Sequence, residues 1–135
     1  MKTHCPAVGV PHVEPCDPVE LAPLIAWLAR GEPCAEPIAF PRGTVLPDGR
    51  LDLCKQSVGP EGARRVLDAA RGHPAIRSIL LETGAIGDAG AASPIGDNID
   101  TLHAGCNRIT DAGVRALSRT RRVARCALAQ AQPSR

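Results

Sequence analysis

A strand-like stretch followed by a turn and a glycine occurs three times in this chain, and this repetition restricts the fold more than any other feature. The three turns read "KQSVGPEG", "TGAIGDAG" and "CNRITDAG". Each has an aliphatic anchor and, four residues later, a glycine: Val58 and Gly62, Ile86 and Gly90, Ile109 and Gly113. The anchors are 28 and 23 residues apart. A recurrence at about 20–50 residues indicates one supersecondary unit stacked several times.

Aliphatic residues alternate before each anchor, and a helical pattern follows it. The inward positions are Leu51 and Leu53, Ile79 and Leu81, and Leu102 and Ala104. Alternation with period two is typical of a short strand with one face on the core. After Val58, Pro60 suits a first helical turn, and Ala63, Val66, Leu67 and Ala70 share one helical face. Pro94 and Gly96 should shorten the second helix to about one turn. These units predict an α/β fold.

The residues between the inward strand positions should stack in rows on the opposite face of the sheet. If the strands are parallel and in register, three rows follow: Arg50, Ser78 and Thr101; Asp52, Leu80 and His103; Cys54, Glu82 and Gly105. This surface combines carboxylates, one leucine and one histidine, a mixture that favours binding over simple solvation.

The order L-x-x-L-x-L-x-x-N-x-I with a helix after it resembles the leucine-rich repeat, and the "IGDAGA" and "ITDAGV" turns resemble its ribonuclease-inhibitor type. The resemblance covers about residues 48–120. It implies a short solenoid of about three repeats, with parallel strands and outer helices. The asparagine of the pattern is present in the third copy as Asn107, whose amide should bind backbone groups. Gln56 and Gly84 replace it in the other copies, so the array is irregular.

The chain divides into three parts on this interpretation. Residues 1–50 form an N-terminal arm and helical cap, residues 51–120 about three repeats, and residues 121–135 a basic, partly disordered tail. In the cap, Asp17 is the expected helix N-cap, with Pro18 first and Glu20 placed for a capping box. No fourth repeat follows Thr120, so Val114 and Leu117 should leave apolar surface that favours association.

The resemblance implies a function as well as a fold. Leucine-rich repeats generally bind proteins, so we expect a non-enzymatic protein–protein interaction module. Its partner would be another protein, in a stable complex or as a homo-oligomer. The residues that we expect to contact it are Asp52, Leu80, Glu82 and His103.

The alternative function is metal binding by the N-terminal arm. His4, Cys5, His12 and Cys16 bring two imidazoles and two thiols into thirteen residues, and zinc takes four ligands of these types. Zinc or copper would then be the cofactor; otherwise no cofactor is expected. The spacing fits no standard zinc finger.

Other classes of protein receive little support. His103 and Cys106 could suggest a nucleophile pair, but no third orienting residue is identifiable. "GAIGDAGAAS" lacks the spacing of a phosphate-binding loop. We therefore expect no enzymatic activity.

Composition and charge restrict the partner and the compartment. A net charge of +2 gives no reason to expect a nucleic-acid partner. The arginines between residues 115 and 125 fit a solvated terminus better than an acidic or nucleic-acid partner. No apolar run is long enough for a membrane span. The first residues lack the apolar core of a secretory signal. A cytoplasmic protein with free or metal-bound rather than disulfide-bonded cysteines is therefore expected.

Overall fold

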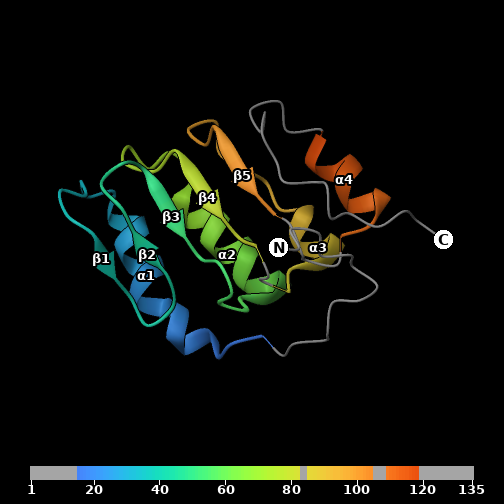
Figure 1. Ribbon diagram of the computed structural model, residues 1–135, viewed down its shortest axis with the longest axis horizontal. Helices are drawn as coiled ribbons and strands as arrows, with labels where there is room; N and C mark the ends of the chain where they lie inside the picture. The colour runs from blue at the N-terminus through green and yellow to red at the C-terminus, as the bar shows by residue number, and fades with distance from the viewer. Residues whose placement is uncertain (1–14, 83–84, 105–108, 119–135) are drawn as a thin grey trace, which may run out of the picture.

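Five short strands form one open sheet, and four helices accompany it, within the residues that the structure describes. The structure is a computed structural model that describes residues 15–82, 85–104 and 109–118 (Figure 1). The elements follow one another as α1 (Pro18–Arg30), β1 (Ile38–Ala39), β2 (Thr44–Val45), β3 (Arg50–Asp52), α2 (Gly59–Ala70), β4 (Ser78–Leu80), α3 (Gly87–Ala91), β5 (Thr101–His103) and α4 (Asp111–Ser118). The spatial order of the strands is their order in the chain. The fold is mixed α/β.

Strands β3, β4 and β5 are parallel and in the predicted register. Their paired positions are Arg50, Ser78 and Thr101, then Leu51, Ile79 and Leu102, then Asp52, Leu80 and His103. The first two predicted outward rows are therefore confirmed. Beyond the strands the backbone pairing continues, because the Lys55 amide donates to the Glu82 carbonyl at 2.9 Å. Gly105 of the third row lies outside the described residues.

The N-terminal part of the sheet is antiparallel, a correction to the parallel sheet with a helical cap that the sequence pattern predicts. Strand β1 pairs with β2, and β2 pairs with β3, in antiparallel fashion. The cause is the turn around Pro47 and Asp48, which reverses the chain so that the Leu46 amide bonds to the Arg50 carbonyl at 2.9 Å. The Asp48 carboxylate accepts from the Arg50 amide at 3.2 Å and stabilises this turn.

Helix α1 begins as its sequence predicts. The Asp17 carboxylate accepts from the Val19 amide at 3.0 Å, and Gly31 ends the helix in the left-handed conformation with φ 67°. Pro23 lies inside the helix without interrupting it. Glu20 differs from the expected capping box, because its carboxylate binds the Arg42 guanidinium at 2.8 Å. The helical cap is thereby tied to the hairpin.

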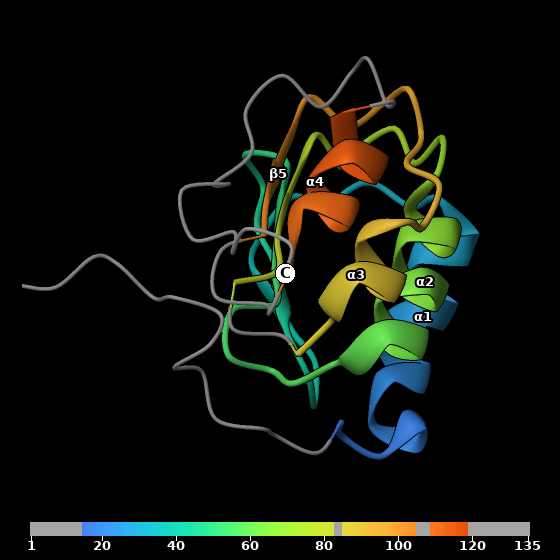
Figure 2. The ribbon, with the colours of Figure 1, turned by 90° about the vertical axis from the view of Figure 1, so that its right-hand side faces the viewer.

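All four helices lie on one face of the sheet (Figure 2). The glycine that recurs in each unit leaves room for the anchor residue four positions earlier. A Cβ on Gly62, Gly90 or Gly113 would lie 3.2, 2.6 or 2.5 Å from a side-chain atom of Val58, Ile86 or Ile109. At Gly62 and Gly113 it would also come too close to the preceding helix, at 2.9 Å from Leu21 Cδ1 of α1 and against the Asp88 carboxylate of α3. At Gly90 the Pro60 Cα of α2 would lie at an ordinary contact distance of 3.5 Å.

The core lies between the sheet and this helix layer. Leu53, Leu81 and Leu102 are at most 1% exposed, which confirms their predicted place in one continuous core. The anchors Val58, Ile86 and Ile109 are buried in the same cluster. Trp27 of α1 stacks on the His73 ring at a centroid distance of 4.8 Å, so α1 packs against the end of the first unit.

The turns after β3 and β4 have the same backbone conformation. Residue by residue, Ser57 and Ala85 have φ values of 53° and 59°. The anchors Val58 and Ile86 are right-handed helical, and Gly59 and Gly87 return to positive φ at 74° and 62°. The repetition in the sequence therefore corresponds to a repetition in the backbone. The helix of the second unit, α3, is also short, as Pro94 and Gly96 predict: it has five residues.

Candidate functional site

The candidate binding surface is the face of the sheet that no described helix covers (Figure 2). Asp52, Leu80 and His103 lie side by side across β3, β4 and β5 on this face, because they are paired in the parallel register. All three are half-buried. The structure thus brings together three of the four residues predicted to contact a partner, in a row that crosses the strands.

Glu82, the fourth predicted contact, lies just beyond β4 and close to Cys54. The Cys54 sulfur is 3.9 Å from the Glu82 carboxylate, and the Cys54 amide donates to the Asp52 carboxylate at 3.0 Å. Both carboxylates therefore meet around one thiol at the carboxyl ends of β3 and β4. The Asp52 side chain is held by its backbone partner, which reduces the conformational entropy that a binding event would cost.

The pKa of the Cys54 thiol is raised by its surroundings at this end of the sheet. Burial, the hydrogen bond with Asp52 and the negative charges of Asp52 and Glu82 raise its pKa to about 11. The thiol is protonated at neutral pH and is therefore a poor nucleophile. Among the described residues no cation lies within ion-pair distance of Asp52 or Glu82, and the nearby Arg50 pairs with Asp48 at 2.8 Å. The surface is locally acidic.

Strained backbone surrounds the same end of the sheet. Lys55, Ser57 and Ala85 follow β3 and β4 at φ values of 61°, 53° and 59°, a region that residues with a Cβ rarely adopt. Such strain is commonly retained at functional sites. Ligands of open parallel sheets also bind beyond the carboxyl ends of the strands. Both considerations place the site at the end that carries Asp52, Cys54 and Glu82.

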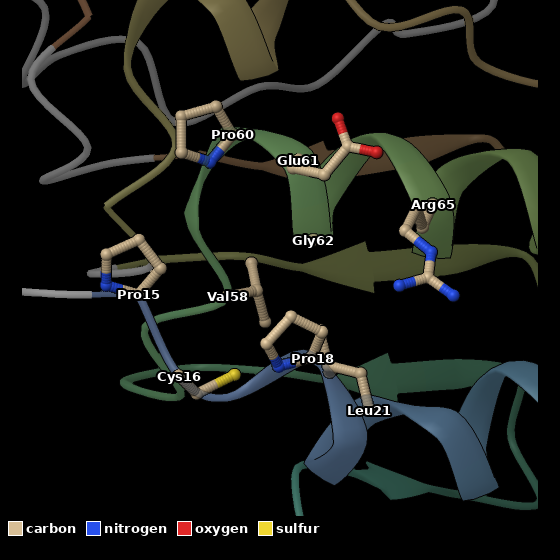
Figure 3. A pocket seen from close by; sticks show the side chains of 9 residues that line it. All are labelled: Pro15, Cys16, Pro18, Leu21, Val58, Pro60, Glu61, Gly62 and Arg65. Carbon is tan, nitrogen blue, oxygen red and sulfur yellow. The ribbon is translucent and has the colours of Figure 1, made fainter.

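A second feature, a small pocket between the beginnings of α1 and α2, was not predicted from the sequence (Figure 3). Its volume is about 100 Å³. The lining residues are Pro15, Cys16, Pro18, Leu21, Val58, Pro60, Glu61, Gly62 and Arg65. They come from two segments, 15–21 and 58–65, that are 37 positions apart at their nearest (21 to 58), so no local pattern could indicate that they meet.

Of the four predicted metal ligands, Cys16 is the one that lies within the described residues. Cys16 is half-buried in the pocket wall, and burial raises the pKa of its thiol. His4, Cys5 and His12 lie outside the described residues. In the part of the chain that the structure describes, no group of three or more histidine, cysteine or acidic side chains is arranged to hold a metal ion. Cys16, Cys34 and Cys54 are free thiols.

Three other expectations concern the ends of the sheet and the class of protein. Cys106, considered as a nucleophile with His103, and Asn107 are outside the described residues, as are the side chains of Val114 and Leu117. None of the described helices has the length and apolar character needed to cross a membrane.

Comparisons with protein-family models, with curated proteins and with solved structures find no match to this chain.

Proposed function

We propose that this chain is a non-enzymatic module that binds a partner protein on the helix-free face of its sheet. The observation that carries the proposal is the register that sets Asp52, Leu80 and His103 in one row, with Glu82 beside Cys54 just beyond it. A single aliphatic side chain with polar and charged neighbours corresponds to the arrangement of a contact surface that has an apolar centre and a polar rim. The protonated Cys54 thiol argues against a nucleophilic role for this site.

We infer further that the β–α units are short, degenerate leucine-rich repeats. Three features support this inference: successive parallel strands in chain order, helices on one face, and the same turn conformation after β3 and β4. The glycines at equivalent positions add a fourth. Repeat solenoids present their strands as an extended binding surface, which agrees with the face chosen above. The carboxylates of Asp52 and Glu82, which form no ion pair with a described cation, favour a partner surface that carries lysine or arginine.

The experiment begins with a photo-reactive amino acid in place of Leu80, which cross-links whatever protein lies on this face in the cell of origin. The identified partner is then titrated with the unmodified chain and with the Leu80→Ala/Glu82→Ala double variant. Loss of a central apolar contact and a charge should weaken binding about 10–100-fold. The melting temperature should change little, since both side chains are half-buried rather than part of the core.

A matched control variant also carries two alanine substitutions, but on the opposite side of the molecule. Asp68→Ala/Arg71→Ala removes an exposed ion pair at the end of α2, in the helix layer. This control should bind the partner as the unmodified chain does. Unchanged affinity in the Leu80/Glu82 variant, or an equal loss in the control, would contradict binding on the helix-free face.

A further inference from the structure

The pocket between α1 and α2 is built from conformationally rigid residues. Pro15, Pro18 and Pro60 have fixed φ angles, and the Cys16 amide donates to the Ser57 carbonyl at 2.7 Å. Pro15 packs directly over Gly59, where a Cβ would come within 2.7 Å of the proline side chain. The walls are therefore formed before any ligand arrives, and a ligand loses no affinity to ordering them.

The size and lining of the pocket select a small branched aliphatic group. Leu21 and Val58 form its buried floor at 1% and 2% exposure, and the proline rings enclose its sides (Figure 3). A cavity of about 150 Å³ is known to hold benzene, with six carbons. The volume of about 100 Å³ found here therefore suits about four carbons. An isobutyl group has four carbons and the compact shape of the pocket.

The charges beside the pocket select an anion. Glu61 is bound by the Arg64 guanidinium, with one contact at 3.2 Å, so its negative charge is compensated. Arg65, the next residue of α2, is exposed and helps to lower the pKa of Glu61, but it takes part in none of the ion pairs between described residues. Arginine at the edge of an apolar hollow is suited to bind a carboxylate through two parallel N–H donors.

We propose that this pocket binds a carboxylate that carries an isobutyl group, with the isobutyl group between the prolines and the carboxylate on Arg65. Two sources share this chemistry: a free branched-chain carboxylic acid and the terminal leucine of a protein chain. The proposal does not depend on the helix-free face, since the pocket lies between the beginnings of α1 and α2. Failure of one site leaves the other untouched.

The test uses the full chain labelled with ¹⁵N and isovalerate as the probe. Isovalerate should shift the amide signals of Cys16, Gly62 and Arg65 and saturate in the millimolar range, at about 1–10 mM. Acetate has the carboxylate without the isobutyl group, and 3-methyl-1-butanol has the isobutyl group without the charge. Each should bind at least about tenfold more weakly.

Two variants test whether isovalerate binding depends on the charge of Arg65 and not on the loss of any positive charge from α2. Arg65→Gln should weaken isovalerate about tenfold and leave the alcohol unaffected. Arg71→Gln, which removes the same charge at the other end of α2, should change neither. No saturable shift at Cys16 and Gly62 with isovalerate up to about 100 mM would overturn the proposal. Equal isovalerate binding by the Arg65→Gln variant and the unmodified chain would also overturn it.

A second pair of probes identifies the source of the carboxylate. N-acetyl-glycyl-leucine and its C-terminal amide differ only in the terminal charge. If the acid binds more tightly than isovalerate and the amide does not bind, the ligand is the end of a protein chain. If isovalerate binds more tightly than the peptide acid, the ligand is a free carboxylic acid. Both outcomes support the shared chemistry.

Discussion

The β3–α2 and β4–α3 units begin with the same backbone and end differently. Both leave their strand through a left-handed residue, a helical anchor and a left-handed glycine. From there α2 continues for twelve residues, whereas α3 stops after five. The turn and the inward side chains are therefore what the two units share, and the length of the helix is free to vary.

The side chain of Asn98, which follows the short helix α3, joins the second unit to the first by hydrogen bonds. Its amide donates to the carbonyls of Ala70 and His73 at 3.0 and 3.1 Å and to that of Ile76 at 3.1 Å. Its carbonyl accepts from the Gly72 amide at 2.8 Å. The segment after α3 thus closes the end of α2. The first unit is held by a long helix, and the second is held by hydrogen bonds to the first.

The largest expected effect tests what the two units have in common. Leu53 and Leu81 occupy equivalent inward positions and are both completely buried. We expect Leu53→Ala and Leu81→Ala each to lower the free energy of unfolding by about 2–5 kcal/mol, because each leaves a cavity in the same core. Chemical denaturation measures both. A cost below about 0.5 kcal/mol for either variant, the level of surface sites, would show that the units are not equivalent.

The sequence predicted the inward side chains that the units share, and also the short helix of the second unit, but not the conformation of the turn. The alternation around Leu53, Leu81 and Leu102 was enough to place the core and the register of β3, β4 and β5. Asp17 was enough to place the start of α1, because capping depends on residues close in the chain. The row Asp52, Leu80 and His103 followed from the register alone, since outward positions are fixed once the inward ones are known.

The features that were missed depend on contacts between distant residues. Asn98 was not identified, although an asparagine in this role was expected at Asn107; its partners lie 22 to 28 positions earlier in the chain. The antiparallel hairpin of β1 and β2 was missed because its two-residue strands are too short to show a period. The pocket needs Pro15 to meet Gly59, which no spacing in the sequence could indicate.

A somewhat smaller effect is expected for the closure of α2. Asn98→Ala removes a donor from the carbonyls of Ala70, His73 and Ile76, of which the first two keep a backbone donor, from the His73 and Ile76 amides. We expect a loss of about 2–3 kcal/mol in the free energy of unfolding, since unsatisfied buried acceptors cost about 1–3 kcal/mol. Asp68→Ala, at an exposed position of α2, is the control and should cost less than about 0.5 kcal/mol. Equal stability of the two variants would show that Asn98 does not support the unit.

A third measurement separates conformation from packing in the shared turn. Gly59 and Gly87 have the same left-handed conformation, but a Cβ on Gly59 would strike Pro15, whereas one on Gly87 would meet nothing within 4 Å. We expect Gly87→Ala to cost about 1 kcal/mol, the price of the left-handed conformation alone. Gly59→Ala should cost clearly more. Thermal unfolding of the pair gives the difference, and equal costs would mean that Pro15 does not pack on Gly59.

The smallest expected effect is a pH dependence that belongs to the first unit. His73 follows α2, whereas the equivalent position in the second unit, three residues before Ile99, is Gly96. The His73 ring is 2% exposed and stacks on Trp27, and burial lowers its pKa below the ordinary value of 6.5. The ring also accepts a hydrogen bond from the Ala75 amide through Nδ1 at 3.1 Å. A second proton on the ring would have to displace that bond.

The sign of the pH effect follows from where the proton binds. Below pH 6.5 the unfolded chain protonates His73 while the folded chain does not, so the unfolded state gains a proton and the free energy of unfolding falls. The fall continues until the pH reaches the lowered pKa of the folded state. Denaturation of the unmodified chain at pH 7.5, 6.5 and 5.5 should show it, and His73→Gln should lack that part of the slope. His103→Gln, on the helix-free face, is the matched control and should retain it. A His73→Gln variant that loses stability with pH as steeply as the unmodified chain would show that the ring takes up its proton without opening the packing against Trp27.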